Sequence, residues 1–321
     1  MKKSIKLAGF TALLAATAAT VQAEVKINDN LAIDGFGIAS GVVTHGTAAS
    51  DDIVLGKSGT DFDSIYVGVT GTYESIKARA SFLAANPFDN TAGDSSGIVE
   101  AFLTYTVEEF SFTVGKYLGY LGYESFYSPN NAFISFSGNA YASPFSTGAK
   151  VDYTGDGFSL GVSARDSQIA GGSGFLTGDG EFTDDIGYET YISITAIENL
   201  TIFAGLGYED VEGGNSALTT NLWVSYNVTE KFTLAGEYAT LEDVSDSSWL
   251  ALASYKLTDE LSVAGRVTHF DGKTADTAGY GVASTYTFTP NFSIKAEITK
   301  KDSDNGGDDP MQYALQGLFR F

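Results

Sequence analysis

The chain is dominated by segments of roughly ten residues in which apolar side chains alternate with small or polar ones. Between Leu200 and Glu209, for example, every second residue is apolar, and the intervening positions hold Thr201, Phe203, Gly205, Gly207 and Glu209. A period of two places the two sets of side chains on opposite faces of a β-strand. No segment shows a sustained 3.6-residue apolar period. Sixteen such runs can be placed, at about 31–43, 62–72, 75–84, 97–107, 110–119, 146–153, 158–166, 186–196, 200–209, 218–228, 232–242, 247–257, 261–270, 278–288, 292–301 and 311–321.

The connections between these runs alternate between tight turns and longer segments. With residues 120–145 set aside, the long segments hold 19 acidic residues and only two basic ones, Lys57 and Lys273. Aromatic residues flank the tight turns, as Tyr255 and Tyr286 do, and Phe319 and Phe321 are expected at the same level. Short turns at one end, long loops at the other and aromatic rings at the membrane boundary are typical of an outer-membrane barrel.

A soluble β-sandwich would also show alternation, but its water-facing side would be rich in Lys and Glu. Here the second face is mainly Gly, Ser, Thr and Ala, and charge is concentrated in one set of loops. Ten tilted residues cover about 25 Å, the height of the apolar band of such barrels. Since only closure removes sheet edges in lipid, the predicted fold is all-β: a transmembrane antiparallel up-and-down β-barrel of about sixteen strands.

The N-terminal residues 1–23 have the layout of a secretory signal peptide. Three lysines precede an apolar run, and Val21-Gln22-Ala23 resembles a cleavage site before Glu24. A retained membrane anchor is the alternative, but the apolar run is shorter than the ~20 residues that span a bilayer. We therefore expect export, with residues 24–321 forming the barrel. No cysteine follows the predicted cleavage site, which excludes a lipoprotein.

The charge and the motifs exclude several classes of function. Removing the three signal-peptide lysines leaves 15 basic residues against 40 acidic ones, which argues against nucleic acid as a partner. His45 and His269 have no convincing Ser/Asp partners, so no catalytic residue is predicted. The acidic stretch 302–309 lacks the Glu that a calcium loop needs at its twelfth position. We expect no cofactor and no dedicated metal site.

The third long segment, residues 119–145, differs from the others because it contains one acid, Glu124, and eight aromatic residues. So apolar a segment should bury itself, and the lumen is the space available. Packing over the barrel rim or against a neighbouring subunit is the alternative. A third loop in this position resembles the constriction loop of sixteen-stranded porins.

A second resemblance is more detailed. Gly115-Lys116, Gly122-Tyr123-Glu124, Tyr127-Ser128, Asn130, Pro144 and Thr147-Gly148 match the pattern of the β-barrel porin-2 (OmpL-like) family over about 35 residues. Where that family tends to have Asn-Gly-Trp-Asp after the next hairpin, this chain has Ala164-Arg165-Asp166-Ser167. The resemblance implies a channel, with Tyr123, Glu124, Tyr127 and Asn130 in the constriction.

If the apolar face touches lipid, then Lys77, Arg79, Lys150 and Arg165 project inward. Strict alternation would turn Lys116 outward, into lipid, and we therefore predict a bulge at Gly115. The inward bases would either face Glu124 and create a transverse field, or pair with wall acids and merely keep the lumen wet. The remaining inward charges are expected at Glu100, Asp152, Glu189, Glu209, Glu237, Lys256, Arg266, Lys295, Glu297 and Arg320.

The function expected from these features is a porin of the outer membrane that passes small hydrophilic solutes or ions. A sugar-selective channel, and a closed structural or adhesive barrel, are the alternatives. The expected partners are outer-membrane lipid and lipopolysaccharide, and the resemblance to sixteen-stranded porins implies a homotrimer. No enzyme activity is expected.

Overall fold

The computed structural model describes residues 24–45, 53–55, 63–85, 95–137, 145–166, 185–211, 216–242, 245–273, 276–304 and 310–321. The predicted signal peptide, residues 1–23, lies outside this part of the chain. The described residues form one antiparallel sheet. Its strands are β1 (Glu24–Asn28), β2 (Leu31–His45), β3 (Ile53–Leu55), β4 (Ser64–Tyr73), β5 (Ile76–Ala85), β6 (Ser95–Val107), β7 (Phe110–Leu118), β8 (Phe145–Gly155), β9 (Phe158–Arg165), β10 (Asp185–Ile194), β11 (Leu200–Val211), β12 (Ala217–Thr229), β13 (Phe232–Leu241), β14 (Ser245–Lys256), β15 (Leu261–Gly272), β16 (Asp276–Thr289), β17 (Phe292–Ser303) and β18 (Met311–Arg320).

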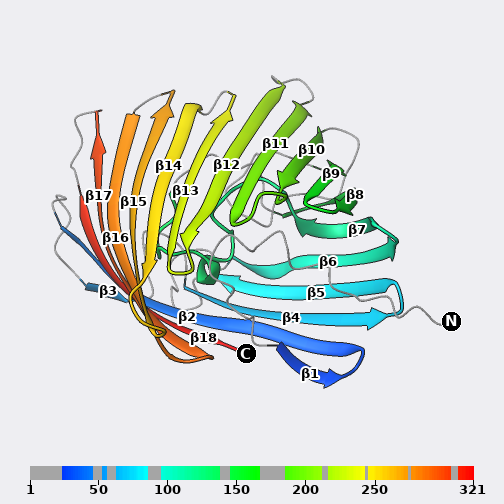
Figure 1. Ribbon diagram of the computed structural model, residues 1–321, viewed down its shortest axis with the longest axis horizontal. Coiled ribbons are helices and arrows are strands. Elements are labelled where there is room, and N and C mark those ends of the chain that lie inside the picture. Colours follow the sequence, from blue (N-terminus) through cyan, green and yellow to red (C-terminus); the bar gives the residue numbers. More distant parts are fainter. Residues whose placement is uncertain are drawn as a thin grey trace.

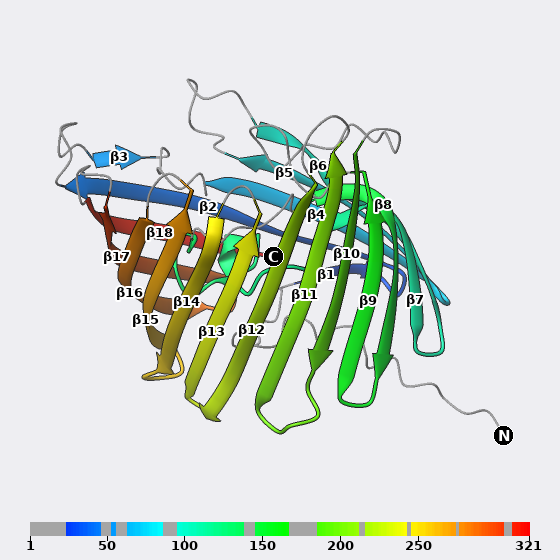
Figure 2. The same ribbon diagram turned by 90° about the horizontal axis from the view of Figure 1, so that it is seen from above.

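Sixteen of these strands close into a barrel (Figures 1 and 2). Each strand from β4 to β18 pairs with its neighbours in sequence, and β2 closes the ring by pairing with β4 on one edge and with β18 on the other. Every run predicted from the alternation corresponds to one of these strands. Positive φ angles at Glu74, Glu108 and Asn199 produce the sharp reversal at three of the tight turns.

Two short strands were not predicted, and both extend an edge of β2. Glu24 of β1 pairs with Asp34, the residue directly before Gly35, and Gly35 itself exchanges two hydrogen bonds with Phe321. β1 therefore continues the line of β18 along β2. On the opposite edge, β3 pairs with Gly41–Val43, beyond the last residue that β4 reaches.

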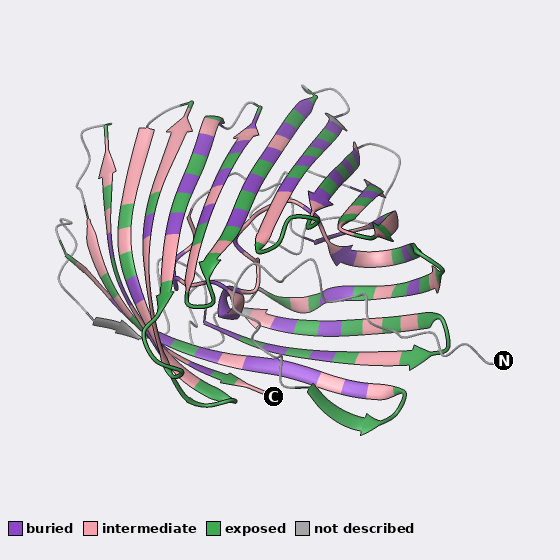
Figure 3. Cartoon of the chain, viewed as in Figure 1, coloured by how far each residue is buried: buried purple, intermediate pink, exposed green. Residues whose placement is uncertain are grey.

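Burial alternates along the strands, which Figure 3 shows as bands of colour. Large apolar side chains such as Val67, Leu222 and Leu315 are exposed on one face, and the polar residues between them are buried. Aromatic residues beside the tight turns, including Tyr255 and Phe292, are exposed on the same face. An apolar outer face without sheet edges is what a barrel surrounded by lipid requires. The predicted fold class is confirmed.

The predicted bulge at Gly115 is wrong. β7 keeps its register through Gly115 against both β6 and β8, although Gly115 itself has a φ of +124°. The irregularity lies instead in β6, where the pairing with β5 shifts between Ser81 and Phe82 and turns both Val99 and Glu100 to the buried face. Lys116 therefore stays on the outward phase. It lies two residues from the end of β7, where a lysine can extend its ammonium group toward water.

The apolar core is not continuous around the wall. It consists of three clusters on the buried face, and each one includes side chains from residues 118–133. One cluster lies on β2, β4, β5, β6 and β18, a second on β10–β12, and a third on β13–β16. The strands thus bury apolar surface mainly where this connection meets them.

Candidate functional site

The connection between β7 and β8 is described over residues 119–137 and contains one short helix, η2 (Ser128–Asn130). This described part is called the crossing segment below. Residues 138–144 of the predicted constriction loop lie outside the described residues. Two hydrogen bonds of the Asn131 side chain connect the residues on either side of η2. The Ser125 N–H donates to Asn131 Oδ1, and Asn131 Nδ2 donates to the Ser125 carbonyl, both at 2.8 Å. Asn130 is half-buried in η2.

The first part of the crossing segment is held by hydrogen-bond acceptors on three strands, β10, β12 and β13. The Tyr120 N–H donates to Glu189 Oε2 of β10 at 3.0 Å, and the Gly122 N–H donates to Asn221 Oδ1 of β12 at 3.0 Å. The Tyr123 N–H donates to Glu237 Oε1 of β13 at 2.8 Å. These wall side chains replace the backbone partners that an irregular segment lacks.

The Glu189 carboxylate is itself fixed by a base that the sequence singled out. Arg165 Nη1 lies 2.6 Å from Glu189 Oε1, and Arg165 Nη2 donates to Ser146 Oγ at 2.7 Å. Both charged side chains are almost fully buried. A Cβ on Gly119 would lie 2.5 Å from the Arg165 guanidinium, so the segment needs glycine where it passes this ion pair.

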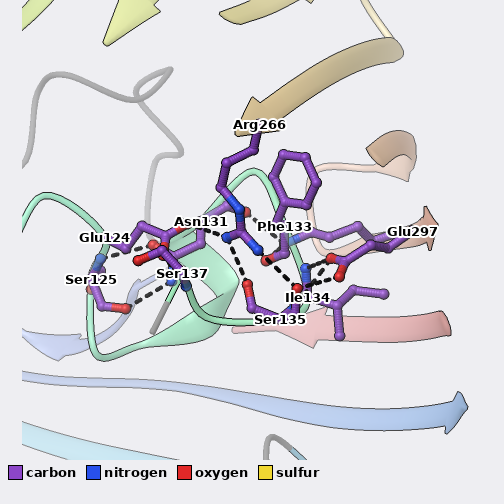
Figure 4. Close-up of polar contacts among 10 residues, drawn as sticks. Glu124, Ser125, Asn131, Phe133, Ile134, Ser135, Ser137, Arg266 and Glu297 are labelled. Atoms are coloured by element: carbon purple, nitrogen blue, oxygen red, sulfur yellow. Dashed lines mark hydrogen bonds and ion pairs between the residues drawn. The ribbon is translucent and has the colours of Figure 1, made fainter. Parts of the chain in front are cut away.

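The middle of the site is an ion pair between the segment and the opposite part of the wall (Figure 4). Arg266 of β15 donates through Nη1 to Glu124 Oε1 at 2.5 Å and to the Ser135 carbonyl at 2.9 Å. Arg266 Nη2 donates to Ser135 Oγ at 2.9 Å, and its guanidinium lies 4.2 Å from the centre of the Phe133 ring. The other Glu124 oxygen accepts from the Ser137 N–H at 2.7 Å. Arg266 thus joins the part of the crossing segment before η2, at Glu124, to the part after it, at Ser135.

Glu297 and Lys295 of β17 form hydrogen bonds with the part of the crossing segment that follows η2. Glu297 Oε2 accepts from the N–H groups of Ile134 and Ser135 at 2.5 and 3.1 Å, and its Oε1 accepts from the Ser135 hydroxyl. Lys295 Nζ donates to the Asn131 carbonyl at 2.6 Å. On β18, Arg320 donates to the Pro129 carbonyl. Wall acids therefore accept from segment N–H groups, and wall bases donate to segment carbonyls.

Aromatic side chains fill the spaces between these polar anchors. Tyr127 packs edge-on against Tyr66 and Phe36, with ring centroids 5.0 and 6.1 Å apart. Tyr123 contacts Trp223 at 5.6 Å, and burial raises the pKa of its phenol to about 12. Phe133 is fully buried against β13–β16, and a Cβ on Gly281 would come within 2.7 Å of its ring.

The other predicted site residues lie on β5, β7 and β8. Arg79 donates through Nε to Glu100 and through both Nη atoms to Asp34, at 2.9 to 3.0 Å. Lys150 lies 3.7 Å from Asp152 and covers the rings of Tyr117 and Tyr120. Lys77 is half-buried on the same face of β5 as Arg79, and Lys116 is on the outward phase of β7.

The sequence left two arrangements open for these bases: facing Glu124, or pairing with acids of the wall. Glu124 contacts Arg266, not the bases of the early strands, and Arg79, Lys150 and Arg165 each contact a carboxylate of the wall. The anchoring roles of Asn221, Glu237 and Glu297 were not predicted. In the sequence, each of them is a polar residue at an inward position of an alternating strand. This pattern predicts the face on which the side chain lies, but not the residue that it contacts.

The described residues contain no helix that is long and apolar enough to cross a membrane. Within the same ranges, no group of three or more His, Cys, Asp or Glu residues is arranged to hold a metal ion. The chemistry that this arrangement offers is hydrogen bonding and charge, distributed over a closed wall and one segment that contacts it.

Comparisons with solved structures give the same architecture. The chain resembles OmpF from Salmonella typhi, in its complex with daunomycin, with a TM-score of 0.70, 15% identity, and coverage of 93% of this chain and 100% of that chain. It resembles OprB from Pseudomonas putida, with a TM-score of 0.70, 12% identity, and coverage of 91% and 94%. It also resembles the anion-selective porin from Comamonas acidovorans, with a TM-score of 0.67, 13% identity, and coverage of 91% and 99%.

At these identities the structural likeness establishes the fold alone. The comparison with curated proteins gave no match. A family model described as "Putative beta-barrel porin-2, OmpL-like" matches residues 61–301, which is most of the chain and includes the crossing segment. The chain therefore belongs to the putative β-barrel porin-2, OmpL-like family.

Proposed function

We propose that the protein is a diffusion porin, in which small hydrophilic solutes pass passively through a water-filled lumen narrowed by residues 119–145. The family and the fold indicate an outer-membrane channel rather than an enzyme. The observation that carries the finer proposal is the set of contacts made by the crossing segment. Its partners come from β10, β12, β13, β15, β17 and β18, all on the buried face of the wall.

A segment anchored on so many sides of a closed ring reduces the open cross-section, because neither end can move to the rim without breaking several buried contacts. Tyr123, Glu124, Tyr127 and Asn130 then belong to the narrow region, and Lys77, Arg79, Lys150 and Arg165 to the wall that surrounds it. Within the wall, bases pair with nearby acids: Arg79 with Glu100, Lys150 with Asp152, and Arg165 with Glu189. These pairs favour mutual neutralisation of the wall charges rather than an electric field directed at Glu124. The proposal includes export through a cleaved signal peptide, contact with lipopolysaccharide and assembly as a homotrimer.

Single-channel recording tests this function. The mature chain, purified in detergent and added to planar bilayers, should give discrete and ohmic conductance steps. The same preparation in liposomes should admit small sugars and exclude large ones. Bilayers that contain the folded barrel yet show no conductance would contradict the proposal and favour a closed structural barrel.

A further inference from the structure

The outward face of the barrel carries a second set of aromatic residues, at the height opposite to the short turns. Six of the nine strands from β10 to β18 have an outward Tyr or Trp six to nine residues from their short-turn ends. All six side chains are exposed: Tyr188, Tyr208, Tyr238, Trp249, Tyr280 and Tyr313. Amphipathic rings at such a height mark the level at which acyl chains give way to lipid headgroups.

This upper aromatic ring is interrupted on the other side of the barrel. Among the described residues, the strands β2 and β4–β9 have no outward Tyr or Trp at the corresponding height. These seven strands are consecutive in the sheet and are coloured blue to green in Figure 1. We call their outward surface the girdle-free sector. Its outward residues at this height are Ala39, Ile65, Phe82, Ile98, Lys116, Ala149 and Ala164.

The gap is not a general shortage of aromatic residues on these strands. Beside the short turns the same strands carry the exposed rings of Tyr73, Tyr105, Phe110 and Phe158. At mid-height the sector is as apolar as the rest of the wall, with Leu103 53% exposed. The girdle-free sector therefore lies within the membrane, but its upper edge lacks the residues with which β10–β18 meet headgroups. A neighbouring protein that covers the sector removes the need for them.

The size of the sector suits a stable contact between proteins. Seven strands about 4.8 Å apart and an apolar band about 25 Å tall give about 700 Å² on one chain, or roughly 1,400 Å² for two, within the usual range of specific interfaces. Copies that insert in the same direction are related by an axis along the membrane normal, and each turns the same sector toward that axis. A closed ring of copies thus covers every sector without a further protein.

From these observations we infer that the girdle-free sector is the surface through which copies of this chain contact one another in the membrane, and that β10–β18 face lipid. The inference rests on the assembly included in the proposed function, and it does not depend on conduction. Seven of the sixteen barrel strands are somewhat less than half of the circumference, so one chain can meet neighbours on both sides of a central axis.

Thiol cross-linking of the full mature chain in liposomes tests the location of the contact, because the chain has no cysteine. Leu103 of β6 and Leu222 of β12 are matched outward leucines, 53% and 48% exposed, and only Leu103 lies in the girdle-free sector. With a short bis-maleimide, Leu103→Cys should shift most of the protein from monomer to covalent dimer on a denaturing gel. Leu222→Cys should remain monomeric. Equal yields at the two positions, or dimers from Leu222→Cys alone, would overturn the inference.

A steric pair of variants gives a second readout. Ala80 of β5 and Ala204 of β11 are exposed outward alanines, inside and outside the sector. Ala80→Trp should reduce the native mass in detergent to that of a monomer, whereas Ala204→Trp should keep the wild-type mass. A heat-dependent gel shift checks that each barrel is folded. A monomeric wild type, or an Ala80→Trp variant with the wild-type mass, would contradict the inference.

The outcome also separates this inference from the proposed function. A monomer that conducts would overturn the interface and leave the porin function standing. An oligomer that cross-links through Leu103→Cys yet shows no conductance would contradict the porin function and leave the interface standing.

Discussion

Arg266 is the residue whose replacement should most disturb the crossing segment. In Arg266→Met, the Glu124 carboxylate loses a partner at 2.5 Å while its side chain stays 98% shielded from solvent, and both Ser135 oxygens lose donors. Removing one partner of a buried ion pair costs about 3–5 kcal/mol, because the remaining charge is uncompensated. A difference of about 1.4 kcal/mol changes an equilibrium constant tenfold. The population of molecules in which the crossing segment has left the wall (the released form) should therefore rise at least about a hundredfold.

Thiol modification measures this release directly, because the chain has no cysteine of its own. Ile134→Cys places a single thiol at a buried position on the segment. The rate of its reaction with a charged maleimide should follow the population of the released form. Arg266→Met should raise the rate about a hundredfold, and adding Glu124→Gln should restore most of the slow reaction. Lys273→Met, which removes an exposed pair with Asp246, is the control and should have little effect. An unchanged rate in Arg266→Met would refute the reasoning.

Three further predictions concern the wall and the segment. Gly281→Val should lower the thermal stability of the folded barrel in a gel-shift assay, because its Cβ would meet the Phe133 ring, whereas Gly37→Ala, with no atom within 4 Å, should not. Tyr127→Ala should increase single-channel conductance by removing a buried ring from the narrow region; conductance equal to wild type would contradict this placement. Leu222→Lys, on the outward face, should reduce the free energy of unfolding in lipid by about 2–4 kcal/mol, measured by urea titration, and equal stability would show that this face does not contact lipid.

The fold could be predicted because its determinants are local. Alternation with a period of two, tight turns flanked by aromatics and acidic long loops together define each hairpin, and in an up-and-down barrel consecutive hairpins are neighbours. Alternation also gave the correct face for Arg79, Lys150 and Arg165. Alternation does not reveal where a strand is irregular: the register shift lies in β6 and not at Gly115, and no property of Val99 distinguishes it from the other apolar residues of β6.

The pairing within the site could not be predicted for a different reason. Glu124 and Arg266 are 142 residues apart, and Ser135 and Glu297 are 162 apart. Which wall residue an irregular segment meets depends on its path across the barrel, and that path is set by all its contacts together. Within residues 119–137 the aromatic side chains are buried or half-buried, as their number in the sequence suggested, but the sequence does not identify the wall residues that they meet.

The arrangement of β1 has a practical consequence for engineering. Phe321 and Glu24 occupy successive positions opposite Gly35 and Asp34, and both run in the same direction along β2. A circular permutant that joins Phe321 directly to Glu24 should therefore need no linker. Tags placed before Glu24 must instead turn away from the sheet, because Gly35 has no backbone hydrogen-bonding group left on that edge.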